Sequence, residues 1–286
     1  MTVGTGKYTY EVIQGWGHLP KGWELGWIPA VAVDSQDRVY VFSRSDHPLV
    51  VFDRKGNFLT SWGEGILKDA HGIFIDSNDH VYCVDRNTHV VRKFTTGGQL
   101  LMTLGTEGHP GKDDEPFDRP TGVAVLPSGE IYVSDGYSNA RVHKFSPTGK
   151  LLLSWGSPGD GPGQFNLPHS VWVDRRGRVL VADRENNRIQ IFNSDGEFLE
   201  QWREFLRPDA LFIDADDTVY VAELDQRVSI LTLKGELLAR WGGEKSSAPG
   251  QFLACPHGIW ADSRGDLYVS EVQANDRIQK FVRRSS

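Results

Sequence analysis

The twelve residues VDSQDRVYVFSR, from Val33 to Arg44, place two apolar runs around a polar turn, and this pattern returns five more times. The later copies are IDSNDHVYCVDR from Ile75, VLPSGEIYVSDG from Val125, VDRRGRVLVADR from Val173, IDADDTVYVAEL from Ile213 and ADSRGDLYVSEV from Ala261. Two apolar runs around an Asp, Asn or Gly turn predict a β-hairpin. Six copies spaced by 40 to 50 residues therefore predict a repeat protein.

A second strand–turn–strand pattern follows each of these hairpins. Examples are VVFDRKGNFLTSWG (Val50 to Gly63), RKFTTGGQLLMTLG (Arg92 to Gly105) and VHKFSPTGKLLLSWG (Val142 to Gly156). A four-stranded unit repeated six times without a helical period predicts an all-β fold, a six-bladed β-propeller. A parallel β-helix is the weaker alternative, because its rungs are shorter and it does not need paired hairpins.

The N-terminal segment supplies a strand pattern that the last repeat lacks. The sixth copy runs out after its third strand, near Phe281, and TYEVIQGWG (Thr9 to Gly17) matches the segments that end the other blades. We therefore expect the N-terminal strand to complete the last blade, which would leave no large sheet edge exposed. No linker pattern interrupts the repeats, so residues 1–286 are expected to form a single propeller domain.

Composition narrows the functional classes. The 286 residues carry 38 acidic and 31 basic side chains, a net charge of −7, which argues against a nucleic-acid partner. Two cysteines exclude a disulfide scaffold. Because neither a spanning apolar run nor a secretion signal is visible, we expect a cytoplasmic protein that does not associate with membranes. A closed propeller is also expected to be a monomer.

Histidine occupies one position of the repeat in alternate copies. We call the residue five before the turn aspartate the first-strand position; the third copy has Leu126 for the aspartate and is aligned by its flanks. In chain order this position carries Pro29, His71, Thr121, His169, Asp209 and His257. Alternate blades of a six-bladed ring lie about 120° apart, so the three imidazoles are expected to converge. Three histidines with an open coordination position are typical of a zinc site.

A simpler explanation for the three histidines is that the original repeat carried a histidine at this position, which was copied when the repeat was duplicated. Duplication does not account for the other residue types at Pro29, Thr121 and Asp209. We therefore predict that His71, His169 and His257 bind one metal ion, with zinc as the preferred metal.

Arginines gather at a second position, fifteen residues after the first-strand position and expected at the same face. It carries Arg44, Arg86, Gly136, Arg184, Leu224 and Val272, and Tyr137 follows Gly136. Guanidinium groups near a metal suit a carboxylate or an oxyanion, and a phenol near a cation can accept a proton. The alternative is that Arg86 and Arg184 merely pair with their neighbours Asp85 and Asp183 at the blade edges.

The copies resemble NHL repeats, most closely in GQFNLPHSVWVDRRGRVLVADRENNRIQIF, Gly163 to Phe192. With SDGYSNAR, Ser134 to Arg141, the chain is similar to peptidyl-α-hydroxyglycine α-amidating lyases, also called peptidylamidoglycolate lyases. These enzymes cleave the carbinolamine C–N bond of a peptidyl-hydroxyglycine to a peptide amide and glyoxylate. The resemblance implies a six-bladed propeller, the three histidines as zinc ligands, Tyr137 as the catalytic base, and Arg184 and Arg44 as catalytic arginines. From its position, Arg86 is expected to bind substrate.

The sequence departs from this family at two places. The family's structural calcium uses two main-chain carbonyls, matched here by Val31 and Ile73, and an aspartate directly after the third histidine. Gly258 occupies that position, so we expect calcium to be dispensable. Ser138 stands where secreted members have a cysteine, which agrees with a reducing compartment.

Two other functional classes remain open. A metal-dependent propeller hydrolase, such as a lactonase, would usually place carboxylate and asparagine ligands where this chain has histidines. A non-catalytic NHL interaction scaffold would need no metal. For the lyase, the expected substrate is a small or peptide-like molecule that bears a carboxylate.

Overall fold

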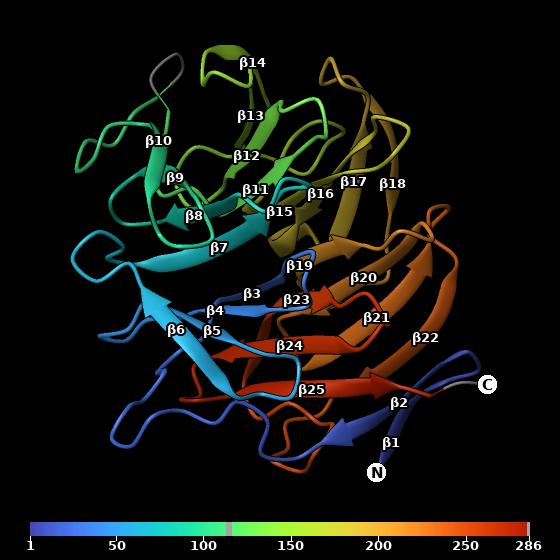
Figure 1. The fold of residues 1–286 in the computed structure, drawn as a ribbon. Helices are drawn as coiled ribbons and strands as arrows, with labels where there is room; N and C mark the ends of the chain where they lie inside the picture. The colour runs from blue at the N-terminus through green and yellow to red at the C-terminus, as the bar shows by residue number, and fades with distance from the viewer. Residues whose placement is uncertain (113–115, 285–286) are drawn as a thin grey trace. The chain divides into compact units, whose positions relative to one another are not determined.

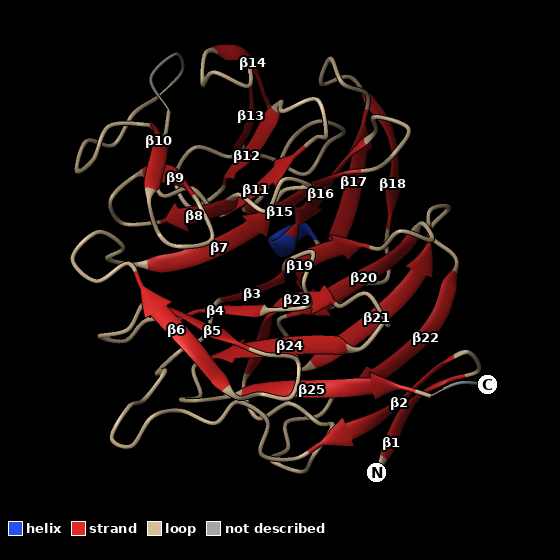
Figure 2. Ribbon diagram, in the orientation of Figure 1, coloured by secondary structure: helices blue, strands red, loops and turns tan. Residues whose placement is uncertain are grey.

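The computed structural model describes residues 1–112 and 116–284, and the chain divides into two compact units. One unit contains residues 67–208, and the other contains residues 1–66 and 209–286. Strands dominate both units (Figure 2), and the one helical element among the described residues is the short 3-10 turn η1, Arg184–Asn186. Within those same ranges, no helix has the length and apolarity that crossing a membrane requires.

The unit of residues 67–208 contains three antiparallel sheets of four strands. The first is formed by β7 (Ala70–Ile75), β8 (Val81–Asp85), β9 (Val90–Phe94) and β10 (Leu100–Leu104). The second is formed by β11 (Gly122–Val125), β12 (Ile131–Asp135), β13 (Arg141–Phe145) and β14 (Leu151–Trp155). The third is formed by β15 (Pro168–Val173), β16 (Val179–Asp183), β17 (Arg188–Phe192) and β18 (Phe198–Trp202).

The unit of residues 1–66 and 209–286 also contains three sheets. One is formed by β3 (Ala30–Val33), β4 (Val39–Phe42), β5 (Leu49–Phe52) and β6 (Phe58–Trp62). The next is formed by β19 (Pro208–Ile213), β20 (Thr218–Glu223), β21 (Arg227–Thr232) and β22 (Leu237–Gly242). The last combines the two chain ends: β23 (Cys255–Ala261), β24 (Leu267–Val272), β25 (Ile278–Arg283), β2 (Tyr8–Ile13) and β1 (Thr2–Thr5).

The sheets confirm the fold class. The described residues form six blades of consecutive antiparallel strands, so the protein is an all-β, six-bladed β-propeller. The N-terminal strand completes the last blade as predicted, because β2 pairs with β25 through Tyr10 with Arg283 and Val12 with Phe281 (Figure 1). One strand was missed: β1 folds back on β2 and makes this sheet five-stranded. The single-domain assignment stays a prediction.

The turn aspartates explain why each repeat begins with a tight hairpin. In five blades one carboxylate oxygen accepts hydrogen bonds from the backbone N–H groups two and four residues later, at 2.8–3.0 Å. The residues concerned are Asp34, Asp76, Asp174, Asp214 and Asp262. The backbone groups of the turn are thereby satisfied, which fixes the hairpin register. In the third blade Leu126 has no such oxygen; its backbone N–H donates to the carbonyl oxygen of Glu130 at 3.0 Å, and its own carbonyl oxygen accepts from Gly129 at 2.8 Å.

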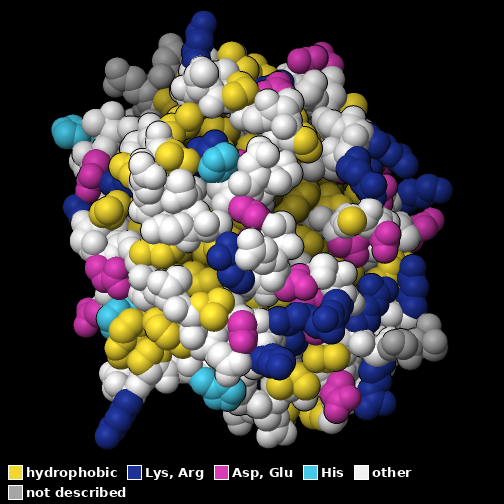
Figure 3. All heavy atoms as spheres, in the orientation of Figure 1, with side chains coloured by type: hydrophobic (Ala, Val, Ile, Leu, Met, Phe, Trp, Pro, Cys, Tyr) yellow, Lys and Arg dark blue, Asp and Glu magenta, His cyan; other side chains and the backbone are white. Residues whose placement is uncertain are grey.

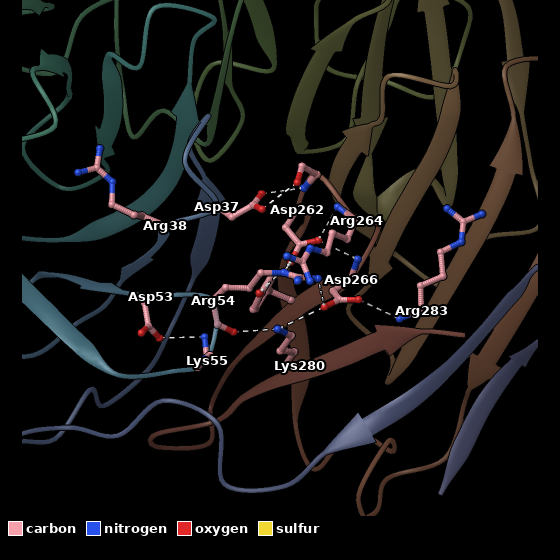
Figure 4. Close-up of polar contacts among 12 residues, drawn as sticks. Asp37, Arg38, Asp53, Arg54, Lys55, Asp262, Arg264, Asp266, Lys280 and Arg283 are labelled. Atoms are coloured by element: carbon pink, nitrogen blue, oxygen red, sulfur yellow. Dashed lines mark hydrogen bonds and ion pairs between the residues drawn. The ribbon is translucent and has the colours of Figure 1, made fainter. Parts of the chain in front are cut away.

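An ion-pair cluster joins the first and last blades of the unit of residues 1–66 and 209–286 (Figure 4). Arg54, in the turn after β5, donates from Nε to Asp262 at 2.6 Å and from Nη2 to Asp266 at 2.5 Å. Lys280 on β25 donates from Nζ to the carbonyl oxygen of Arg54 at 2.8 Å. Both carboxylates are buried, so their charges depend on these partners.

We expect Arg54→Met to destabilise the protein by about 2–4 kcal/mol, because it leaves Asp262 and Asp266 buried without their main cation. Urea unfolding measures the change. Lys55→Met is the matched control, since Lys55 is exposed in the same turn, and it should change stability by less than about 0.5 kcal/mol. Equal effects of the two substitutions would contradict a role for the cluster in joining the blades.

The surface carries charges of both signs. On the face drawn in Figure 3, Lys and Arg side chains lie among Asp and Glu side chains. Surface ion pairs of the protein include Arg178 with Glu200 at 3.1 Å and Lys68 with Glu107 at 2.6 Å, each with at least one well-exposed partner. Exposed pairs of this kind contribute little to stability, so the buried aspartates and the apolar strands hold the blades together.

Candidate functional site

Two of the three predicted histidines lie in the unit of residues 67–208. His71 and His169 are each the second residue of the first strand of a blade, β7 and β15, and both are buried. Nδ1 of His71 lies 2.7 Å from the carbonyl oxygen of Thr121. Because a carbonyl can only accept, Nδ1 carries the proton and Nε2 keeps a lone pair. This tautomer suits a metal ligand that coordinates through Nε2.

Tyr137 brings a hydroxyl group to both histidines. Its Oη lies 3.1 Å from Nε2 of His71 and 3.4 Å from Nε2 of His169. The two imidazole rings are 4.8 Å apart between centroids, and the nitrogen atoms that could hold a metal ion lie within 4.8 Å of each other. Two imidazole Nε2 atoms and one phenol hydroxyl therefore lie close together.

Two arginines flank this group. The guanidinium carbon of Arg86 lies over the ring of Tyr137 at 5.2 Å from the centroid, and that of Arg184 lies over it at 5.9 Å. Both distances are within the range of a cation–π interaction. The structure thus brings together five residues singled out in the sequence: His71, His169, Tyr137, Arg86 and Arg184.

Asp85 and Asp183, which precede Arg86 and Arg184 in the sequence, pair with other groups that stabilise the blades. Asp85 accepts from the backbone N–H groups of Lys68 and Asp69 and pairs with Arg92 at 3.3 Å. Asp183 in the same way accepts from the backbone of Asn166 and pairs with Arg188 at 2.7 Å. Among the described contacts, the neighbour pairing considered for Arg86 and Arg184 is therefore absent.

The third histidine lies in the other unit. His257 is buried in β23, and its Nδ1 lies 2.7 Å from the carbonyl oxygen of Pro29 and 3.4 Å from a carboxylate oxygen of Asp209. Nδ1 again faces acceptors, so Nε2 keeps its lone pair. Pro29 occupies a first-strand position that lacks histidine, and its carbonyl oxygen orients His257 instead.

Arg44 lies in the same unit as His257. Its backbone N–H donates to the carbonyl oxygen of Trp27 at 2.8 Å, and its guanidinium lies over the Trp27 ring at 5.7 Å. A cavity of about 310 Å³ opens beside Arg44 and is lined in part by Trp23, Glu24 and His47. Arg44 therefore borders a cavity large enough to take part of a small ligand.

Gly258 stands where the family has its calcium-binding aspartate, and the space around it is narrow. A side-chain Cβ at this position would lie 2.5 Å from Oγ of Ser270 and 2.8 Å from Cα of Ala30. These distances are shorter than real carbon contacts, so the surroundings exclude the aspartate that the family places there. The residues do not fit the family's calcium site, and the expectation that calcium is dispensable stays a prediction.

Sequence reasoning missed the carboxylates that hold the two arginines. Nε of Arg86 donates to Asp69 at 2.8 Å, and Nε of Arg184 donates to Glu185 at 2.8 Å. Both acids lie outside the strands, at positions that do not recur through the repeat. Their short distance in sequence from His71 and Arg184 was the only available signal.

Comparison with known proteins identifies the family of the chain. NHL repeats are recognised at residues 117–145 and 165–192. NHL repeat-containing protein 3 of Homo sapiens is 35% identical, over 97% of this chain and 85% of its own length. Peptidyl-alpha-hydroxyglycine alpha-amidating lyase 1 of Drosophila melanogaster is 32% identical over 80% of this chain, which spans 47% of that relative.

A solved structure supports the same fold. A gluconolactonase from Xanthomonas campestris superposes with a TM-score of 0.68 at 12% identity, covering 91% of this chain and 86% of its own. At that identity the likeness concerns the fold alone. The chain belongs to the NHL-repeat β-propeller family, and within it resembles the peptidyl-α-hydroxyglycine α-amidating lyases.

Proposed function

We propose that this protein is a metal-dependent carbon–nitrogen lyase. Its substrate would be an α-hydroxyglycine-type carbinolamine with a carboxylate, and its products an amide and glyoxylate. The observation that carries the proposal is the Tyr137 hydroxyl 3.1 Å from Nε2 of His71, with two guanidinium groups over the same phenol ring. The names of relatives at 31–32% identity support the same reaction class.

His71, His169 and His257 would hold the metal, with zinc preferred for an all-imidazole set. The donor chemistry fits, since carbonyl oxygens at Nδ1 leave the Nε2 lone pairs of His71 and His257 available. When bound, the ion supplies a Lewis acid that polarises the substrate hydroxyl. The alternate-blade spacing in the sequence supports the assignment of all three histidines to one ion.

Tyr137 would move the proton. In its deprotonated form Oη accepts the hydroxyl proton of the carbinolamine, the C–O bond becomes a carbonyl, and the C–N bond breaks with its electron pair on nitrogen. Tyr137 then returns the proton to that nitrogen, which leaves as the amide. The atoms balance without water, an oxidant or a reductant.

The arginines would bind and orient the substrate. Arg86 and Arg184 present guanidinium groups beside Tyr137, where a planar fork matches a carboxylate. Arg44, beside its own cavity, would contribute a further cation to the same task. By binding the substrate carboxylate, the arginines would fix the hydroxyl-bearing carbon near Oη of Tyr137. Their positive charge would also stabilise negative charge that develops as the C–N bond breaks.

Product analysis tests this function. With zinc-loaded protein, α-hydroxyhippurate should yield benzamide and glyoxylate in equal amounts. A lactone, such as a gluconolactone, should not be hydrolysed above the rate in buffer. Lactone hydrolysis without glyoxylate release would instead favour a propeller hydrolase, and the absence of both activities would favour an interaction scaffold.

A further inference from the structure

Each arginine beside Tyr137 is held at the same atom by a carboxylate. Arg86 donates from Nε to Asp69, and Arg184 donates from Nε to Glu185, both at 2.8 Å. The backbone N–H of Arg86 also donates to the carbonyl oxygen of Asp69 at 3.0 Å. Two arginines from different blades therefore share one arrangement: a carboxylate at Nε and the guanidinium carbon over the phenol ring.

Glu185 is the more constrained of the two acids. The same oxygen, Oε1, also accepts from Nη2 of Arg207 at 3.1 Å. Burial acts to raise the pKa of Glu185, but the hydrogen bond from Arg207 and the charge of Arg184 outweigh it and lower that pKa. Glu185 is therefore ionised at neutral pH and forms charge-assisted hydrogen bonds to both arginines.

The backbone around Glu185 is fixed as well. Its N–H donates to the carbonyl oxygen of Asn166 at 3.1 Å, within the 3-10 turn η1. The turn ends at Asn187, whose φ of 54° is in the left-handed region and whose side chain accepts from the backbone of Arg207 at 2.9 Å. Glu185 and Arg207 are thus held by separate backbone contacts, which makes their ion pair a rigid support for Arg184.

We propose that Asp69 and Glu185 are positioning residues, which fix the guanidinium groups of Arg86 and Arg184 beside Tyr137 in the orientation that binds a substrate carboxylate. The inference rests on the proposed function. A free arginine side chain samples many rotamers, and ordering it on substrate binding weakens affinity. A carboxylate at Nε orders the side chain beforehand, so the guanidinium group is already oriented when the substrate carboxylate binds.

The kinetic test uses Glu185→Gln and Asp69→Asn, which keep size and one acceptor oxygen while removing the charge. We expect KM for α-hydroxyhippurate to rise about 5- to 30-fold in each, with kcat reduced by less than about threefold. Glu200→Gln is the matched control. Glu200 lies on the outer strand β18 and pairs with Arg178 at 3.1 Å, so its substitution should leave KM and kcat unchanged. An unchanged KM in both site variants overturns the proposal.

A double-substitution cycle separates positioning from a general loss of charge. Arg184→Lys keeps the charge and lacks the Nε donor, so Glu185→Gln should add less than about twofold to KM in that background. Additive effects would mean that Glu185 acts on substrate independently of Arg184, and would overturn its positioning role.

A third readout does not depend on activity. In ¹⁵N-resolved spectra the Nε–H groups of Arg86 and Arg184 should exchange slowly with water in the wild type. Exchange of the Arg184 group should become fast in Glu185→Gln, and that of Arg86 in Asp69→Asn. Slow exchange in the variants overturns the proposal even if glyoxylate is formed. If exchange is slow in the wild type and fast in the variants, but the wild type forms no glyoxylate, the positioning role stands and the lyase function is wrong.

Discussion

Tyr137→Phe should lower turnover of α-hydroxyhippurate by roughly 10²–10⁴, the range typical of a lost general base. The substitution keeps the ring, and with it the contacts of Arg86 and Arg184 at 5.2 and 5.9 Å. It removes only Oη, the atom 3.1 Å from Nε2 of His71. KM should therefore change little, since the carboxylate contacts remain.

Tyr82→Phe is the matched control, because it removes a hydroxyl that faces the turn aspartate Asp76 at 3.4 Å. Glyoxylate formation by both variants is compared at equal metal loading. Turnover of Tyr137→Phe at the wild-type rate would show that another group accepts the proton.

His169→Ala should remove most of the bound metal. Loss of an outer-shell partner alone typically weakens metal affinity by 10–100-fold, so loss of a ligand should weaken it by more than about 100-fold. The residue is buried, and its Nε2 faces the Tyr137 hydroxyl, so alanine removes a nitrogen that faces the same hydroxyl as Nε2 of His71. Elemental analysis after dialysis measures the metal content.

His80→Ala serves as the control, since His80 lies in a hairpin turn and pairs with Asp76 at 3.0 Å. It should retain one metal ion per chain. Full occupancy in His169→Ala would exclude His169 as a ligand.

The fold could be predicted because each blade repeats the same pattern of apolar strands and polar turns. The turn aspartates satisfy two backbone N–H groups each, and apolar strands of fixed length follow at fixed spacing. The strand β1 was missed because Thr2–Thr5 is short and has no counterpart in the repeat. Pairing of β2 with β25 could be predicted, since it restores the fourth strand that the sixth copy lacks.

The candidate site could be predicted only where it departs from the repeat. His71 and His169 stand out against the other residue types at the first-strand position. Tyr137 drew notice because it follows Gly136, which stands where other blades have arginine or an aliphatic residue. The carboxylate partners could not be predicted in this way. Asp69 lies in an irregular segment before β7, and the pairing of Glu185 with Arg184 depends on the 3-10 turn that follows β16.

The central claim is that a metal at the three histidines supports C–N cleavage, and one titration tests it most directly. Metal-free protein is given increasing zinc, and the initial rate of glyoxylate formation from α-hydroxyhippurate is measured at each ratio. We expect no turnover without metal and a linear rise in rate that levels off at one zinc per chain. A rate that is independent of zinc, or no glyoxylate at any ratio in a protein that has bound one zinc, would contradict it.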